Sequence, residues 1–210
     1  IMYWWLGSIE QNRGEMAEAS TYYRKAADIY RHIYGDHHGE TLNIAYAIAW
    51  TLEKLGMGDE GEKYLREVVG NARNILGIED PQRLQATNTL GNFLMQRGNV
   101  AEAESLFLEE LTSCTELLED NHPRTLAELM RMGTFLYSQQ KYDSAEIYLL
   151  KSLEGHQNFY GRAHPLTMEA LSDWGQYWWD AANDPSKALA AVEESVQMYS
   201  SFYVPLHPRT

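Results

Sequence analysis

The chain has 210 residues, of which 44% are hydrophobic and 22% are charged, a composition typical of a folded protein with a sizeable core. Its formal net charge is -13, and its 17 basic residues are scattered along the sequence. Binding to a nucleic-acid backbone depends on clustered Lys and Arg, so we expect no nucleic-acid partner. The acidity either keeps the surface soluble or, alternatively, forms an acidic docking surface.

The sequence carries no sign of a membrane or secreted protein. No apolar run approaches the roughly 18 to 20 residues that span a bilayer, so we expect no membrane partner. The single cysteine, Cys114, cannot form an internal disulfide, and no Asn-x-Ser/Thr site occurs. Both features favour a reducing compartment, and we predict a cytoplasmic protein. The chain starts at Ile1 without a methionine and stops at Thr210 within a repeated phrase, so we expect it to be a piece of a longer protein.

The sequence repeats itself with a constant period of 42 residues. The period links Gly39, Pro81, Pro123 and Pro165. One series of small residues recurs at Gly7, Ala49, Gly91, Gly133 and Gly175, and a second at Ala19, Gly61, Ala103 and Ala145, then at Ala188 after one inserted residue. We predict a single array with repeats at 1–34, 35–76, 77–119, 120–161 and 162–203, and the start of a sixth at 204–210.

Each copy has the pattern of two helices joined by a turn. In the third copy Leu84, Leu90 and Leu94 share one helical face, which predicts a buried stripe. Proline is favourable at the first position of a helix, so His122-Pro123 and His164-Pro165 indicate helix starts. The letters QRGN at 96–99 end the first helix of the third copy. The second helix carries a stripe at Ala103, Phe107, Leu111 and Cys114. Sustained period-two alternation is missing, so the predicted fold class is all-α.

On these residues the chain resembles the tetratricopeptide repeat (TPR) family, and its 42-residue His-Pro-x-Thr-Leu repeats are similar to those of kinesin light chains. The matching positions are Leu90-Gly91 with Ala103 and Phe107, and Met132-Gly133 with Ala145 and Leu149. The sequence departs from the pattern at Gly39 in place of Pro, at Gly61 in place of Ala, and at the Pro185 insertion. The resemblance implies a right-handed α-solenoid of about five helix-turn-helix repeats, whose concave groove, lined by the first helices, binds peptides or protein segments.

The register of the resemblance assigns nine residues to this groove. They are Tyr46, Trp50, Asn88, Asn92, Met95, Met130, Tyr137, Gln176 and Trp179. Aromatic rings offer rigid contact surfaces and amides pair with an extended backbone, so we predict a protein or peptide ligand with apolar or aromatic anchors. In the wall of this groove, formed by the first helices, only Lys54 and Arg131 would carry positive charge. Alternatively, the aromatic residues pack against neighbouring repeats, and the asparagines form a solvated face.

The sequence contains no pattern that indicates catalysis, so we expect neither an enzyme nor a bound cofactor or metal. His37-His38 lies in a predicted turn between repeats and is interpreted as helix punctuation. Cys114 falls on an apolar stripe, which predicts a buried thiol. The carboxylate pairs Glu102/Glu104 and Glu109/Glu110 alternate with apolar positions and are interpreted as a solvated convex face.

Three functions are compatible with such an array. The leading one is a protein–protein interaction module that binds a peptide or protein segment. The alternatives are a regulatory or sensor array within a larger nucleotide-binding switch protein, and an accessory domain that positions a catalytic partner. The apolar residues of the last predicted helix also indicate self-association, because no polar capping helix follows to cover this end of the array. Its apolar residues are Ala188, Val192, Val196 and Tyr199, followed by Phe202 and Tyr203.

Overall fold

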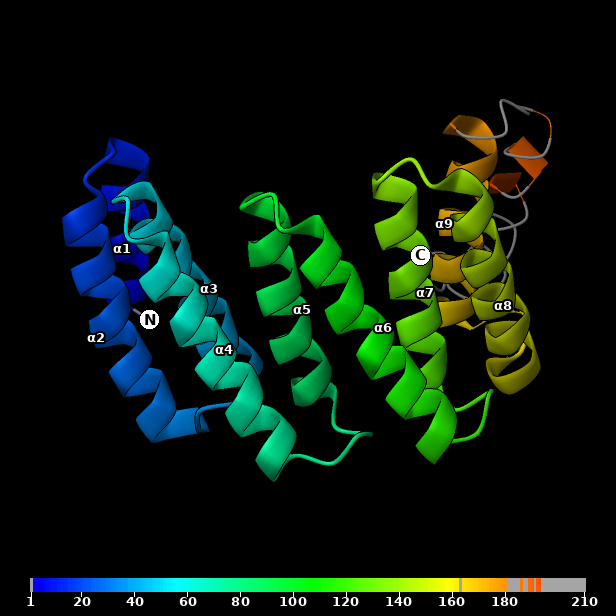
Figure 1. Cartoon of the computed structure of the whole chain (residues 1–210), viewed down its shortest axis with the longest axis horizontal. Coiled ribbons are helices and arrows are strands. Elements are labelled where there is room, and N and C mark those ends of the chain that lie inside the picture. The colour runs from blue at the N-terminus through cyan, green and yellow to red at the C-terminus, as the bar shows by residue number, and fades with distance from the viewer. Residues whose placement is uncertain (1, 163, 181–185, 187–188, 191, 194–210) are drawn as a thin grey trace, which may run out of the picture. The chain divides into compact units, whose positions relative to one another are not determined.

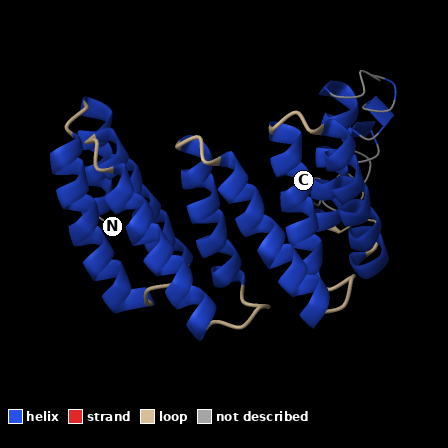
Figure 2. Cartoon of the chain, in the orientation of Figure 1, coloured by secondary structure: helices blue, strands red, loops and turns tan. Residues whose placement is uncertain are grey.

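The computed structural model describes residues 2–162 and 164–180, together with residues 186, 189, 190, 192 and 193. All regular structure in these residues is helical, which confirms the predicted all-α class (Figures 1 and 2). The helices are α1 (Met2–Arg13), α2 (Met16–Tyr34), α3 (Gly39–Lys54), α4 (Gly58–Ile75), α5 (Pro81–Gln96), α6 (Val100–Leu117), α7 (Pro123–Ser138), α8 (Tyr142–Tyr160) and α9 (Pro165–Asp180). The Pro185 insertion, the start of a sixth repeat and, except for Val192, the apolar residues predicted between 188 and 203 lie outside the described residues.

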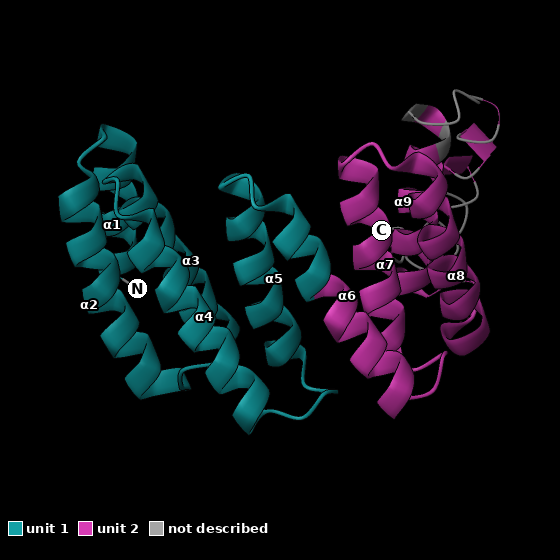
Figure 3. Cartoon of the chain, viewed as in Figure 1, with its two compact units in different colours: residues 1–106 teal, residues 107–210 magenta. Residues whose placement is uncertain are grey.

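The chain divides into two compact units, residues 1–106 and residues 107–210 (Figure 3). Odd-numbered helices are the first helices of the predicted repeats, and even-numbered helices are the second helices. In the first unit each helix from α1 to α5 packs on the next, and α3 also packs on α5. In the second unit α8 packs on both α7 and α9, and α7 contacts α9. The first helices α3 and α5 are therefore neighbours in the first unit, as are α7 and α9 in the second.

The first helices α3, α5, α7 and α9 share a start signal in which a side chain accepts a backbone hydrogen bond. The Nδ1 atoms of three N-cap histidines accept from the backbone N–H two residues further on, at 3.1 to 3.3 Å; they are His38, His122 and His164. Asp80 takes the same position before α5 and accepts from Gln82 N–H at 2.8 Å. Such caps satisfy one of the amides that a helix start leaves unpaired. The helices thus start where the His-Pro pairs and His37-His38 predicted; the proline at the first helical position was the expected reason, and the histidine side chain adds the cap.

The threonine of the repeated phrase closes the preceding turn. Its hydroxyl donates to a carbonyl six residues earlier in three repeats: Thr41 to Gly35 at 2.9 Å, Thr125 to Glu119 at 3.1 Å and Thr167 to Gly161 at 2.8 Å. The phrase therefore has a local structural function, because it begins a helix and fixes the turn in front of it.

The turn between the two helices of a repeat requires a left-handed residue. Three repeats place a glycine there, and the φ angles of Gly14, Gly56 and Gly98 are 85°, 78° and 82°. The fourth repeat places Gln140 there, with φ 59°. A residue with a Cβ pays a steric cost of roughly 1 to 2 kcal/mol in this region.

We therefore expect Gln140→Gly to raise the free energy of unfolding by about 1 kcal/mol. Chemical denaturation of the full chain measures this difference. Gly98→Gln is the matched control, and it should lower stability by a similar amount because it creates the same strain in the neighbouring turn. A loss of stability in Gln140→Gly would show that the glutamine side chain matters more than its backbone strain.

A buried cluster of charged side chains lies between α6 and α7 in the second unit. Arg124 Nη2 lies 3.4 Å from Glu110 Oε2 and 2.7 Å from Glu128 Oε1, and Arg131 Nη1 lies 3.1 Å from Glu128 Oε2. The side chains of Glu110, Arg124 and Glu128 are at most 3% exposed. The Arg131 guanidinium also lies 5.5 Å from the centre of the Phe107 ring.

Two expectations from the sequence are wrong at this cluster. Glu110 is buried, not solvated, although Glu102 and Glu109 are exposed as expected. Arg131 does not add charge to an exposed wall, because its side chain is only 12% exposed and is paired with Glu128. Burial lowers the pKa of Arg131 to about 10, so the guanidinium is still protonated at neutral pH. Carboxylates and guanidinium groups that neutralise each other explain how these residues enter the core.

Candidate functional site

In the first unit, the wall predicted for ligand binding carries two half-buried aromatic residues on α3. Lys54 Nζ lies 5.2 Å from the ring centre of Trp50, a distance typical of a cation–π contact. The Tyr46 hydroxyl is hydrogen-bonded to the Gln96 side chain of α5, and burial raises the pKa of Tyr46. Both rings are thus positioned by neighbouring side chains while remaining partly accessible.

The neighbouring helix α5 supplies amides at the positions 42 residues later. Asn92 is exposed, while Asn88 and Met95 are half-buried. Among the described residues, the shielded Oδ1 atom of Asn88 has no hydrogen-bond partner. The side-chain carbonyl of Asn88 is therefore an acceptor without a donor. The exposed amide of Asn92 presents both a donor and an acceptor to solvent.

A further amide contact joins the two first helices beside Gly39. Gln85 Nε2 lies 3.3 Å from both Asn43 Oδ1 and the Gly39 carbonyl oxygen. A Cβ at position 39 would lie 2.7 Å from Gln85 Oε1, so a proline there would crowd this side chain. Oε1 is the end of a flexible side chain, so Gln85 can move aside for a larger residue at position 39.

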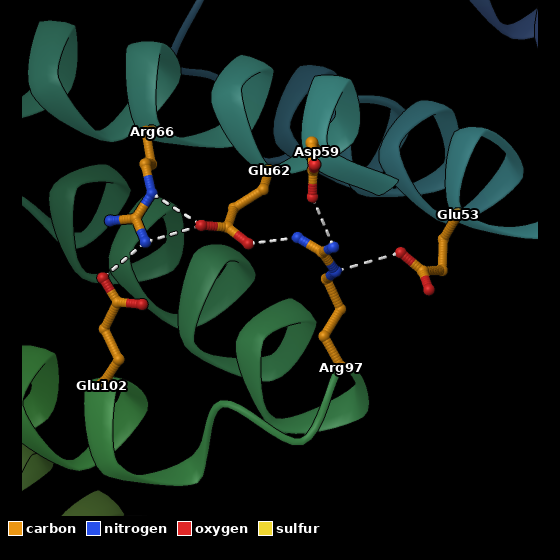
Figure 4. A network of polar contacts seen from close by, with 6 residues as sticks. All are labelled: Glu53, Asp59, Glu62, Arg66, Arg97 and Glu102. Carbon is orange, nitrogen blue, oxygen red and sulfur yellow. Dashed lines mark hydrogen bonds and ion pairs between the residues drawn. The ribbon is translucent and has the colours of Figure 1, made fainter. Parts of the chain in front are cut away.

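An ionic network ties the turn after α3 to the turn after α5 (Figure 4). Arg97 contacts Glu53 at 3.1 Å, Asp59 at 2.7 Å, and Glu62. Arg66 contacts Glu62 at 2.7 Å and reaches Glu102 at the start of α6 (Figure 4). Gly58 leaves room for this network, since a Cβ there would lie 1.9 Å from Glu53 Oε2. The network fixes the ends of α3 and α5, on which the aromatic and amide side chains stand.

In the second unit the predicted residues have unequal surroundings. Met130 packs against the buried cluster of Leu153, Ala170 and Leu171. The Tyr137 ring lies 5.8 Å from the ring of Tyr142. Gln176 is exposed, and Trp179 on α9 is 59% exposed. Met130 is half-buried, whereas Trp179 presents a large apolar surface to solvent.

The described residues contain no group of three or more His, Cys, Asp or Glu side chains placed to hold a metal ion. Within the same residues, every helix is too short or too polar to cross a bilayer. Cys114 is buried, as its place on an apolar stripe predicted. The wall predicted for ligand binding presents aromatic surfaces and amide hydrogen-bonding groups.

Comparison with protein families gives a consistent match. Two family models described as tetratricopeptide repeat match the chain, one at residues 1–74 and 125–201 and the other at residues 83–124. A comparison with curated proteins found no significant match.

Solved structures with a similar fold include kinesin light chain-like repeat proteins. A kinesin light chain-type protein from Podosopora anserina with nearly identical TPR-like repeats has a TM-score of 0.61 at 18% identity, covering 96% of this chain and 95% of that one. BtubC (BKLC) from P. vanneervenii has a TM-score of 0.60 at 20% identity, covering 98% and 81%. A Rap protein complexed with Competence and Sporulation Factor has a TM-score of 0.59 at 14% identity, covering 94% of this chain and 53% of that one. These similarities establish an all-α repeat solenoid.

Proposed function

The chain belongs to the tetratricopeptide repeat family, and from this premise we propose that it is a protein–protein interaction module that binds a linear peptide or protein segment on its first helices. The observation that carries the proposal is the pairing of accessible aromatic residues on α3 with amides at equivalent positions on α5. Trp50 and Asn92 occupy one such pair of positions, and Tyr46 and Asn88 occupy another.

The chemistry of these residues suits an extended segment with apolar anchors. An indole or phenol ring buries a large area with few rotatable bonds, so it binds at a low entropy cost. The amides of Asn88 and Asn92 can pair with the N–H and C=O groups of an extended backbone. A peptide ligand also has precedent in this fold, since one similar Rap structure is a complex with the Phr* peptide. We include Met95 in this site, and propose Met130, Tyr137, Gln176 and Trp179 as the corresponding surface of the second unit.

We also propose a cytoplasmic location, which a single cysteine, the buried Cys114, favours. The ligand would then be a cytosolic protein or peptide. An affinity pull-down with the full chain, followed by peptide mapping of the retained proteins, identifies it.

Once a peptide is mapped, Trp50→Ala and Asn92→Ala should each weaken its binding by about 1 to 3 kcal/mol, as expected for central anchors. Isothermal titration with the synthetic peptide measures the effect. Lys63→Ala, on the exposed face of the second helix α4, is the control and should leave affinity unchanged. If both wall variants fold normally and bind as tightly as the native chain, the proposed surface is wrong.

A further inference from the structure

A pocket in the first unit binds one of the chain's own arginines, Arg31. It lies between the second helices α2 and α4 and has a volume of about 160 Å³. Arg31 Nη2 donates a hydrogen bond to the Tyr64 hydroxyl, and the guanidinium lies 5.7 Å from the centre of the Tyr64 ring. Arg31 Nε also lies 3.4 Å from Asp36 Oδ1, and Nη1 lies 3.7 Å from Asp28 Oδ1. Carboxylates and a phenol ring thus hold a guanidinium at this position.

The second unit repeats this pocket between α6 and α8. Most of its lining residues follow those of the first pocket by two periods of 42 residues. Asp120 takes the place of Asp36. Tyr148 takes the place of Tyr64, and Thr115 stands at the position of the arginine. The volume of the second pocket is larger, about 290 Å³, because a threonine fills less space than an arginine.

Two carboxylates of the second pocket have no ion-pair partner among the described residues. Asp120, in the turn before α7, and Glu154, on α8, both line the pocket and are exposed. Lys151 carries the single positive charge in the described part of the lining. Asn121 and Asn158 add side-chain carbonyl groups that accept hydrogen bonds. Two carboxylates against one ammonium give the pocket a negative potential, which favours a cationic ligand.

Large apolar side chains are exposed on the two helices that flank the pocket. Leu117, the last residue of α6, is 70% exposed, and Phe159, near the end of α8, is 53% exposed. The first unit also exposes Ile33 and Ile75 at the equivalent positions, so the apolar rim is common to both pockets. What distinguishes the second pocket is the position of the arginine. An arginine side chain suits such a rim, because its stem is apolar and its head is charged.

We propose that the pocket between α6 and α8 binds an arginine side chain of another protein, in a segment where bulky apolar residues flank the arginine. Asp120 pairs with this guanidinium as Asp36 pairs with Arg31, and Glu154 provides the second carboxylate. A guanidinium suits the pocket better than an ammonium, because its planar fork donates two hydrogen bonds to a carboxylate and stacks on an aromatic ring. The pocket belongs to the second helices, whereas the proposed peptide wall belongs to the first helices. This proposal therefore does not depend on the proposed function.

The test compares three blocked tripeptides, Leu-Arg-Leu, Leu-Lys-Leu and Leu-citrulline-Leu. Citrulline keeps the shape of arginine but carries no charge. Each peptide is titrated into the isotope-labelled full chain, and binding is followed by the NMR shifts of the amides in residues 115–121 and 151–158. We expect Leu-Arg-Leu to bind about tenfold more tightly than Leu-citrulline-Leu, and more tightly than Leu-Lys-Leu. Equal binding of the arginine peptide and either of the others, or shifts only outside these residues, would overturn the proposal.

Two variants locate the bound arginine. Thr115→Arg places the chain's own guanidinium where Arg31 stands in the first unit, so it should compete with Leu-Arg-Leu and weaken its binding by about tenfold. Asp120→Asn removes the equivalent of Asp36 and should weaken binding by a similar factor. Asp143→Asn alters an exposed carboxylate of α8 outside the lining, so it is the matched control and should bind as the native chain does.

Thermal melting shows that each variant is folded. Native affinity in both Thr115→Arg and Asp120→Asn would overturn the proposal. Analytical ultracentrifugation of the native chain tests another occupant. Dimers that Thr115→Arg dissociates would show that a second copy of the chain fills the pocket, which also overturns the proposal.

Discussion

Arg124→Ala is expected to lower the free energy of unfolding by about 3 to 5 kcal/mol, because it leaves buried carboxylates without their counter-ion. Glu128 Oε1 lies 2.7 Å from the guanidinium and Glu110 Oε2 lies 3.4 Å from it, and both side chains are at most 1% exposed. Without Arg124, the cluster keeps two carboxylates and only Arg131. Urea denaturation of the full chain, followed by circular dichroism, measures the loss.

Two comparisons isolate the effect of burial. Arg13→Ala removes an ion pair with Glu10, but the Arg13 side chain is 65% exposed, so stability should change by no more than about 0.5 kcal/mol. Replacing all four charged residues of the cluster with apolar residues of similar volume should cost less than Arg124→Ala alone, because no charge then remains unpaired in the core. If Arg124→Ala proves as stable as Arg13→Ala, water reaches the cluster.

The sequence was sufficient to predict the helices because their signals are local. A 42-residue period, a proline or histidine at the start of α3, α5, α7 and α9, and a glycine at most turns place the helices to within a few residues. Burial of the apolar stripes was equally predictable, as Ala103, Phe107, Leu111 and Cys114 show. Each of these signals is formed by residues close together in sequence. Because it recurs in the following repeat, the assignment of one repeat can be checked against the next.

The failures concern side chains whose partners come from another helix. Glu109 and Glu110 are adjacent in sequence, yet Glu109 is exposed, whereas Glu110 is buried against Arg124, which lies 14 residues further on. The helical spacing does distinguish them, because Glu110 follows Phe107 by three residues and precedes Cys114 by four, which places it on the buried stripe. The repeat register also selects Tyr46 and Met130 alike for the ligand-binding wall, and it does not show that Met130 packs against Leu153 and Ala170. The nine predicted site residues stay a prediction that binding measurements must decide.

One departure from the repeat pattern is explained by an exchange of small residues between two helices. Elsewhere the first helix carries glycine and the second carries alanine, as in Gly133 and Ala145, whereas the second repeat carries Ala49 and Gly61. A Cβ on Gly61 would lie 2.8 Å from the Ala49 carbonyl oxygen and 3.1 Å from its Cα. These are backbone atoms of α3, so they cannot move aside as the end of a side chain would. The close approach of α3 and α4 thus allows only one methyl group between them.

Gly61→Ala should therefore destabilise the protein by about 1 to 3 kcal/mol through overpacking, although alanine is the better helix former. Gly70→Ala on the same helix is the matched control: its Cβ would meet nothing within 4 Å, so it should stabilise by roughly 1 kcal/mol.

Ala49→Gly alone should also destabilise, because it adds a helical glycine and leaves a small void. The double variant Ala49→Gly with Gly61→Ala restores the arrangement of the other repeats and should be more stable than the sum of the single effects predicts, by about 1 to 2 kcal/mol. Thermal and urea denaturation of the four proteins complete this double-mutant cycle. Strict additivity would mean that α3 and α4 separate to accept the extra methyl group, and that the exchange of glycine and alanine is incidental.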